Sequence, residues 1–176
     1  MSRRVIAGLL ALLVVAVAVY WFGFRQATVE ADLQVPQLAA TIGEGEEAVA
    51  VAGNGAVVRW LPPPEEQPLP RLPLDEVPKG GRLRGPALEQ VRVLAAVPDE
   101  LRPFVASSYF GESGVDVELT NGIELRFGDD TQATQKWHAA AAVLADPSVS
   151  VLDYVDLHAP DRPSYDGSSY ELPPPP

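Results

Sequence analysis

The sequence predicts an α+β fold, in which one N-terminal transmembrane helix is followed by a mostly antiparallel sheet with two packed helices. Three observations lead to this fold class. An uncharged apolar run occupies 5–24, β-rich runs flank two Asn-Gly pairs, and apolar residues recur at helical spacing in two later stretches. The chain has 176 residues, which is enough for one ordinary domain in addition to the apolar run.

The apolar run predicts a membrane anchor. Its length corresponds to a helix of about 30 Å, the thickness of a bilayer core. Arg3 and Arg4 precede it, so residues 1–4 are expected in the cytoplasm and the rest of the chain outside. A cleaved signal peptide ending near Ala18 is the alternative. The apolar run continues past that point with aromatic residues, which favours a retained anchor.

Charge and cysteine content narrow the function. The chain has 13 basic and 24 acidic residues, a net charge of −11, and no cysteine. Nucleic acid and an anionic membrane surface would both be repelled, so neither is expected as the main ligand. Disulfide bonds and cysteine metal sites are excluded, so an extracytoplasmic domain must rest on its hydrophobic core.

The stretch after the anchor, 25–46, is predicted to be a stalk with at most one strand, or a disordered linker. The domain itself is expected over 47–166. It opens with a hairpin around Asn54, because a tight turn needs the positive φ angles that Asn and Gly tolerate. A proline-rich arm then covers 62–78, where seven prolines argue against both a helix and a central strand.

The middle of the domain alternates helix and strand signals. A helix opens at Pro86 and is followed by a first β-rich run. Two further strands flank Asn121-Gly122, with apolar residues on one face and charged residues on the other. Glu118 and Arg126 share the charged face and are expected to pair.

The next predicted element is a helix over 131–145. Asp129 or Asp130 is expected to cap its start. Trp137 belongs to the packing face of this helix, whereas Lys136 is expected to be exposed or to lie at an interface.

A strand over 149–157 is the last clear element. Prolines interrupt the pattern after it, and 162–165 are expected to resume a strand at an edge of the sheet, where proline is tolerated. The remaining residues, 167–176, are expected to form a disordered tail.

No set of residues predicts catalysis, a metal or a cofactor. His158 lies near Asp156 and Asp161, but a Gly-x-Ser-x-Gly elbow is absent, so a surface histidine is the better interpretation. The pair Asp129-Asp130 lacks the alternating acids of a calcium loop. Phosphate loops and dinucleotide fingerprints are also absent. The sequence therefore favours a membrane-tethered binding module, without a small-molecule substrate, over an enzyme.

The ordered pieces of the domain resemble the FtsQ/DivIB family of bacterial cell division proteins. The resemblance is carried by 115–129, by Lys136 in the following helix, and by 153–157 with prolines after it. It covers about 100–166 and extends, through the hairpin and the proline-rich arm, back to 47. Family members have a short cytoplasmic end, a membrane helix, a POTRA domain and a β domain. The stretch 25–46 has room for a POTRA remnant only, which puts POTRA-based recruitment to mid-cell in doubt.

The resemblance implies a non-enzymatic, single-pass divisome scaffold in the plasma membrane, at the division septum. In the family, the C-terminal strands of the β domain bind an FtsB/DivIC-type partner by strand addition, and FtsL joins the complex. The matching residues, expected to bind the partner here, are Tyr154, Asp156, Arg162, Ser164 and Tyr165. Tyr154 has the alternative of packing in the core.

Two other functions stay open from the residues alone. One is a membrane-anchored envelope binding protein with no role in division. The other is an envelope hydrolase, for which His158 and His138 are the candidate catalytic residues.

Overall fold

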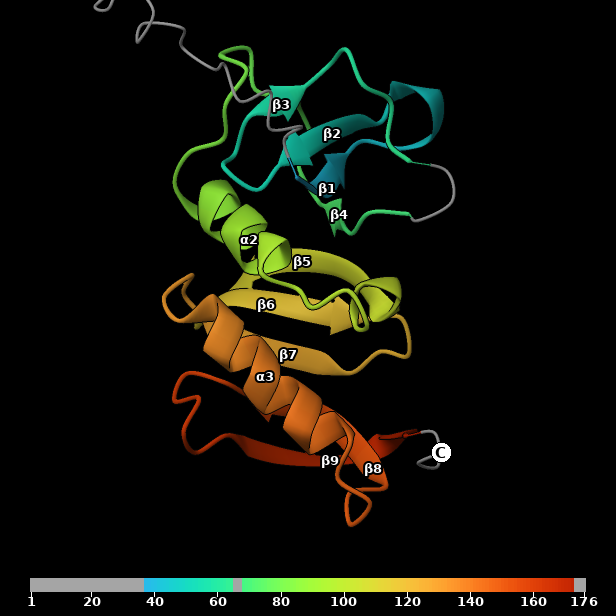
Figure 1. Ribbon diagram of the computed structural model, residues 1–176, viewed down its shortest axis with the longest axis vertical. Helices are drawn as coiled ribbons and strands as arrows, with labels where there is room; N and C mark the ends of the chain where they lie inside the picture. Colours follow the sequence, from blue (N-terminus) through green and yellow to red (C-terminus); the bar gives the residue numbers. More distant parts are fainter. Residues whose placement is uncertain (1–36, 65–67, 173–176) are drawn as a thin grey trace, which may run out of the picture. The chain divides into compact units, whose positions relative to one another are not determined.

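One sheet of nine strands runs through the part of the chain that the structure describes (Figure 1). The structure is a computed structural model, and it describes residues 37–64 and 68–172. The strand order is β3-β2-β1-β4-β5-β6-β7-β8-β9. The pairs β1–β2, β2–β3, β5–β6, β6–β7 and β8–β9 are antiparallel, and the other three are parallel. Two α-helices accompany the sheet in these residues, which confirms the predicted α+β class.

The first four strands are short. They are β1 (Leu38–Ile42), β2 (Val49–Ala52), β3 (Val57–Val58) and β4 (Arg71–Leu72), with a 3-10 turn at Gly45–Glu47. The predicted hairpin is the β2–β3 pair. Its turn is closed by Asn54, whose Oδ1 accepts a hydrogen bond from the Ala56 amide at 3.0 Å, and by Gly55, whose φ of 81° favours glycine.

Strand β1 lies in the stretch predicted as stalk or linker, and it is built into the sheet. It pairs with β2 on one side and with β4 on the other, and its Ala39, Ala40 and Ile42 are buried. Alanine has a low strand propensity, which explains why the sequence indicates this strand only weakly. Its position within the sheet compensates, because both of its edges are hydrogen-bonded.

The proline-rich arm supplies a central strand, so that part of the prediction was wrong. Strand β4 lies between β1 and β5 and is parallel to both. Pro70 and Pro73 lie directly outside its two residues, so Arg71 and Leu72 keep the amide groups that a ladder needs. The Pro70 carbonyl accepts a hydrogen bond from the Thr41 amide at 2.9 Å. Proline is thus excluded from the ladder itself but not from its ends.

The second half of the sheet has longer strands. They are β5 (Val105–Gly111), β6 (Gly114–Leu119), β7 (Glu124–Gly128), β8 (Val151–Asp156) and β9 (Ser164–Glu171). The predicted alternation is confirmed around β7, where Ile123, Leu125 and Phe127 are all fully buried. Strands β7 and β8 are parallel and are joined by helix α3 (Ala133–Leu144), the kind of crossover that parallel neighbours require.

Strand β9 contradicts the predicted disordered tail over part of its length. The strand begins at Ser164, inside the predicted edge strand, but it continues to Glu171. Its centre, Gly167 to Ser169, has little strand propensity of its own. The strand is held by contacts with β8 that no local pattern reveals.

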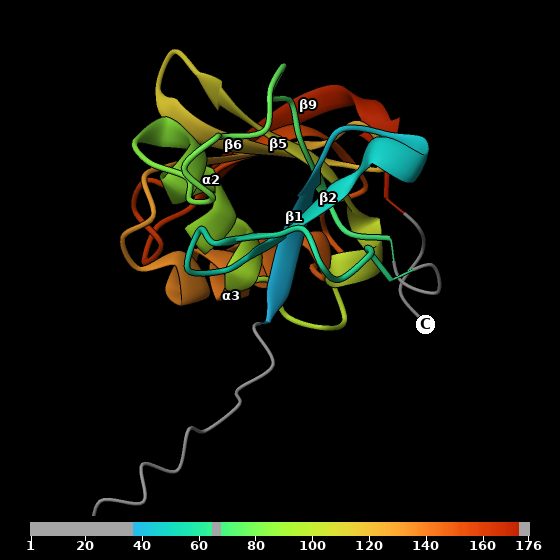
Figure 2. The ribbon, with the colours of Figure 1, turned by 90° about the horizontal axis from the view of Figure 1, so that it is seen from above.

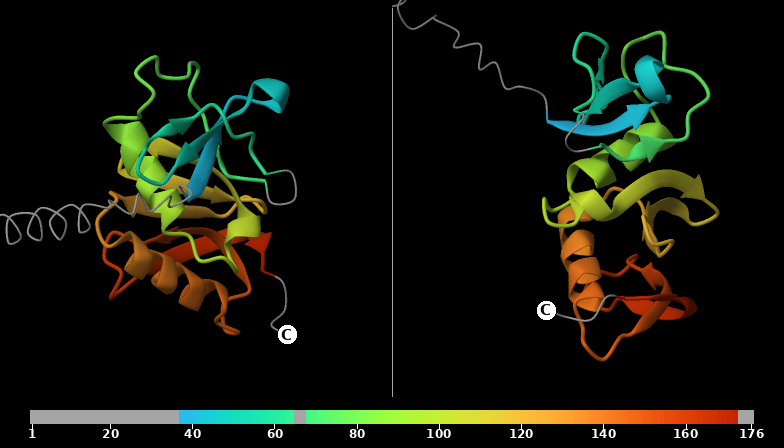
Figure 3. Two further views of the ribbon diagram at one scale, coloured as in Figure 1. Left: turned by 45° about the horizontal axis from the view of Figure 1, so that its top comes forward. Right: turned by 90° about the vertical axis from the view of Figure 1, so that its right-hand side faces the viewer.

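Helices α2 (Pro86–Ala95) and α3 pack on the same face of the sheet (Figures 2 and 3). Trp137 of α3 is fully buried between them and the strands. Its Nε1 donates a hydrogen bond to the Val93 carbonyl of α2 at 2.8 Å, and its ring centroid lies 4.9 Å from that of Phe127 on β7. Trp137 therefore ties both helices to the sheet, as its predicted position on the packing face requires.

None of the helices in the described residues is both long and apolar enough to cross a membrane. The predicted anchor, 5–24, and the predicted cytoplasmic end, 1–4, lie outside those residues.

Candidate functional site

Strand β9 forms one edge of the sheet, with β8 as its only neighbour among the described strands. Seven of its eight residues are exposed, including Tyr165 (46% exposed) and Tyr170 (39%). An edge of this kind presents backbone N–H and C=O groups without ladder partners, so a second chain can add a strand to it. This edge is the candidate binding site.

The attachment of β9 to β8 is irregular at its centre. The register of the two strands shifts between Leu152 and Tyr154. At this shift the Asp153 carboxylate accepts hydrogen bonds from the backbone amides of Ser169 (2.9 Å) and Ser168 (3.1 Å). Hydrogen bonds from Ser169, and then from the Ser168 amide, hold the pKa of Asp153 below its usual value. The side chain thus replaces ladder contacts that the shift removes.

Gly167 lets the two strands approach closely at the same point. A Cβ atom at this position would lie 1.9 Å from the backbone nitrogen of Asp153. Sequence reasoning missed both Gly167 and Asp153 as residues that hold the site. An isolated glycine within a strand is the available signal, because it often marks a bulge or a close backbone approach.

The five residues predicted to bind a partner fall on two strands and a loop. Tyr154 and Asp156 lie on β8, which is not the edge strand, while Ser164 and Tyr165 lie on β9. Arg162 lies in the connection, where its amide donates a hydrogen bond to a carbonyl of the same turn. Asp156 and Ser164 are register partners and share one face of the sheet.

Tyr165 points to the other face. Its register partner on β8 is Val155, which is fully buried on the helix side. At the edge of the sheet, however, little covers Tyr165. The edge therefore offers a polar face around Ser164 and an aromatic side chain on the opposite face.

Tyr154 belongs to a polar surface on the face of β5–β8 that bears no helix in the described part of the chain. Its ring lies 3.9 Å from the guanidinium carbon of Arg126, a cation–π contact. Arg126 forms an ion pair with Glu124, which also accepts a hydrogen bond from the Tyr109 hydroxyl. Burial acts to raise the pKa of Glu124, but the hydrogen bonds from Tyr109 and Arg126 outweigh it and leave that pKa lowered. Tyr154 is thus half-buried rather than packed in the core.

The expected pair of Glu118 with Arg126 does not form. The β6–β7 turn closes where the Leu119 amide donates to the Ile123 carbonyl at 2.9 Å, so Glu118 stands opposite Glu124. Asp116, not Glu118, is the register partner of Arg126. The sequence places the turn correctly, but the exact residue at which it closes decides which charges meet.

Asp116 is the buried member of this polar surface. It is only 7% exposed, and its Oδ1 lacks a hydrogen-bond partner in the described part of the chain. Burial, and next the negative charge of Glu124, raise the pKa of Asp116 to about 6. The charged form of this side chain costs folding free energy, so the stability of the fold depends on pH.

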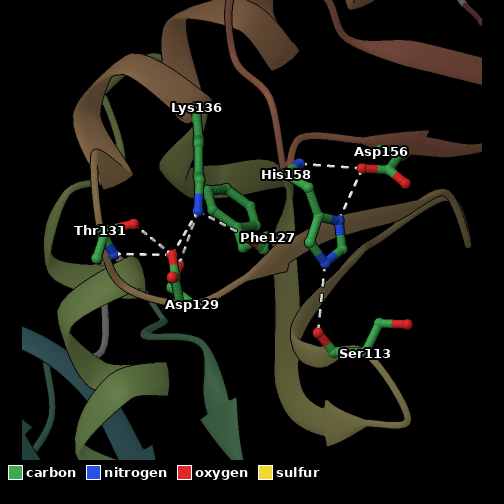
Figure 4. Close-up of polar contacts among 7 residues, drawn as sticks. All are labelled: Ser113, Phe127, Asp129, Thr131, Lys136, Asp156 and His158. Carbon is green, nitrogen blue, oxygen red and sulfur yellow. Dashed lines mark hydrogen bonds and ion pairs between the residues drawn. The ribbon is translucent and has the colours of Figure 1, made fainter.

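Lys136 is buried, so the expectation of an exposed or interface cation was wrong (Figure 4). It lies four residues before Ala140, on the same buried stripe of α3. Its Nζ donates to the Phe127 carbonyl (2.8 Å), the Asp129 carbonyl (3.2 Å) and Asp129 Oδ1 (2.7 Å), which uses all three ammonium donors. The hydrogen bond from Lys136, followed by that from Thr131, lowers the pKa of Asp129.

The predicted helix cap is also wrong, because Asp129 and Asp130 contact other groups. Helix α3 begins at Ala133 after Gln132, which has a left-handed φ of 53°, and no side chain caps it. Asp129 is turned instead toward Thr131 and Lys136, and Asp130 pairs with Arg92 of α2 at 2.8 Å. The Asp129 carboxylate thus contacts residues in and just before α3, and the Asp130 carboxylate joins this segment to α2.

His158 lies on the surface, as predicted, and holds the end of β8 (Figure 4). Its Nδ1 and its amide lie 2.8 Å and 3.0 Å from Asp156 Oδ1, and its Nε2 lies 3.3 Å from the Ser113 carbonyl oxygen. Burial acts to raise the pKa of Asp156, but the contacts with His158 outweigh it and lower that pKa. A carbonyl oxygen is not a nucleophile, so this cluster joins a turn to a strand and provides no hydrolytic set.

Among the described residues, no group of three or more His, Asp and Glu side chains is arranged to hold a metal ion. What the described residues do present is a strand edge with a polar surface beside it.

Residues 40–158 match the family described as cell division protein FtsQ/DivIB, C-terminal. The match covers about two thirds of the 176 residues. The match ends before β9. No curated protein matches the chain.

Proposed function

This chain belongs to the FtsQ/DivIB family of cell division proteins, and we propose that it is a non-enzymatic divisome scaffold in septum formation. It binds small division partners of the FtsB/DivIC and FtsL types by strand addition to β9. The observation that carries this proposal is the outer edge of β9, which has no neighbour among the described strands and seven exposed residues of eight. The scaffold character of the family supports it.

In strand addition, the affinity and the specificity for the partner come from different groups. The backbone of β9 supplies hydrogen bonds along its length, and side chains next to it select the partner. Tyr165 and Arg162 are the proposed anchors at the edge, because Tyr and Arg are enriched at interface hot spots. Ser164 and Asp156 contribute polar contacts on one face, with Tyr154 behind them. A partner strand would therefore be held on both faces.

The proposed location is the plasma membrane at the division septum. The segment 5–24 anchors the chain, 1–4 remain in the cytoplasm, and the β domain works outside. In this proposal the β domain extends from β1 to β9, because both strands belong to one sheet. The stretch before β1 links it to the anchor.

The replacement Tyr165→Ala tests the proposal. It is expected to weaken partner binding about 30-fold, the effect of removing a hot-spot side chain worth about 2 kcal/mol. The tagged full-length chain is recovered gently from membranes, and co-purifying small bitopic proteins are quantified by mass spectrometry. Trp60→Ala is the matched control, because Trp60 is 75% exposed and follows β3 at the other end of the strand order.

Two results would contradict the proposal. Equal partner recovery with both variants would remove β9 as the binding edge. Recovery of other envelope proteins in place of division partners would instead favour an envelope binding protein with no role in division.

A further inference from the structure

An apolar groove of about 700 Å³ opens beside the C-terminal end of β9. Its walls come from segments far apart in the sequence. They are Leu101 and Phe104 before β5, the β6–β7 turn, Leu144 in the last turn of α3, and Leu172 directly after β9. The groove is separate from the polar surface around Arg126 and contains none of the residues that the sequence predicted for binding.

The apolar side chains of this groove are incompletely covered. Phe104 is 55% exposed, although its backbone is fixed by a hydrogen bond of 2.7 Å from the Thr120 amide to its carbonyl. Leu101, Leu144 and Leu172 pack against the core on one side and stay partly exposed on the other. Several apolar side chains gathered in one concave surface are typical of a binding site, whereas single exposed ones are not.

We propose that this groove is the second half of the partner-binding surface, and that the chain which adds a strand to β9 places a large apolar side chain in it. The inference rests on the proposed strand addition. Continuity supports it, because Glu171 ends β9 and also lines the groove, together with Leu172. A chain paired along β9 would therefore pass beside Glu171 and Leu172, two of the residues that line the groove.

Length and charge define the partner segment. Tyr165 and Glu171 are six residues apart, about 20 Å along a strand, so one segment of about ten residues reaches both the centre of β9 and the groove. The Glu171 carboxylate at the rim favours a basic residue next to the apolar one. The net charge of −11 disfavours a second copy of this acidic chain as the occupant.

Site-specific photocrosslinking in the full-length chain tests the inference. A benzophenone amino acid replaces Phe104 in the groove, Tyr165 on β9, or Trp60 as an exposed aromatic control, each in a separate variant. Cross-linked peptides are then identified by mass spectrometry. We expect the Phe104 and Tyr165 positions to capture the same partner chain, at sites about six to nine residues apart, and the Trp60 position to capture neither site.

The other outcomes overturn the inference in distinguishable ways. Capture from Tyr165 alone is consistent with the proposed function, but it excludes the groove as part of the partner-binding surface. Capture by Phe104 of 173–176 of the same chain, or of a second copy, identifies a different occupant. If neither position captures a partner chain, the proposed strand addition to β9 is itself contradicted.

A conventional substitution gives a second readout. Phe104→Ser is expected to lower recovery of the partner from membranes about tenfold, because it removes the apolar side chain that closes the groove. The fold should be retained, since Phe104 is largely exposed. Recovery equal to that of Trp60→Ala would overturn the inference.

Discussion

Strands β7 and β9 both pair with β8, but they are held in different ways. Strand β7 alternates half-exposed and buried residues, and its Leu125 and Phe127 are fully buried. Strand β9 has seven exposed residues of eight and depends on Asp153, Gly167 and backbone contacts. Burial of apolar side chains stabilises the first, whereas hydrogen bonds and a close backbone approach position the second. One side of β8 thus carries the hydrophobic core, and the other side carries the strand that is proposed to bind a partner.

Removal of the Trp137 side chain, which packs against β7, should have the largest effect on stability. Trp137→Ala is expected to lower the free energy of unfolding by about 3–5 kcal/mol, because a fully buried ring and its hydrogen bond to Val93 are lost. Urea unfolding of the full-length chain measures it, with Trp60→Ala expected within about 0.5 kcal/mol of the original chain. Similar values for the two variants would break the comparison.

Asp116→Asn tests the polar surface beside β7, because Asp116 lies on β6 as the register partner of Arg126 on β7. The pKa of Asp116 is raised to about 6, so between about pH 4 and 6 the folded state holds a proton that the unfolded state releases. Stability therefore falls as the pH rises through this window. The variant should be about 2 kcal/mol more stable than the original at pH 7.5 and equal to it near pH 4.

Urea unfolding at the two pH values measures this difference. Glu118→Gln is the control, since Glu118 lies on the same strand but is exposed. An Asp116→Asn effect that is the same at both pH values would contradict the assignment.

Asp129→Asn tests the buried cation next to β7, with a smaller effect. The loss of a charged hydrogen-bond partner from Lys136 should cost about 1 kcal/mol at pH 7, a modest value because the Asp129 side chain is 55% exposed. The pKa of Asp129 is lowered, so its contribution is present above the usual aspartate pKa and is lost as the pH falls through the lowered value. Thermal unfolding at pH 7 and pH 3 should show the difference shrink, and a constant difference would argue against the pair.

Gly167→Ala sharpens the comparison from the β9 side, with the smallest effect on global stability. The added Cβ would collide with the Asp153 backbone and detach the centre of β9. The free energy of unfolding should change by less than about 1 kcal/mol, since few apolar side chains are uncovered. Hydrogen exchange of the β9 amides should nevertheless accelerate by at least about tenfold. Gly80→Ala, where open space surrounds the added atom, is the control.

The sequence predicts those parts of the structure that produce a local pattern in the chain, and it misses those that depend on contacts between distant residues. The β6–β7 hairpin and the packing face of α3 are local periodic patterns, and the structure confirms Leu125 and Trp137 as buried. Lys136 was assigned wrongly, because a charged residue on a buried stripe is allowed only by the oxygens that the fold brings to it. Sequence spacing contains no sign of those partners.

The candidate site divides in the same way. An edge strand over 162–165 is predicted from the residues themselves, and the structure has Tyr165 on β9, the outermost of the described strands at that end of the sheet. Its extension to Glu171 depends on Asp153 of the neighbouring strand, which is a contact between residues 15 and 16 positions apart. The groove at Phe104 joins segments still more distant. Such features arise from the tertiary arrangement and have no local pattern.

The order of the strands also constrains when the binding edge exists. Strand β8 lies between β7 and β9 and is separated from β7 along the chain by the whole of α3. During synthesis the chain emerges from its N-terminus, so β9 is the last of the described strands to be made, and it can pair only once β8 is in place. The edge at β9 is thus the last part of the sheet to be assembled. A partner that adds a strand to this edge, as proposed, would associate only with molecules whose sheet is complete.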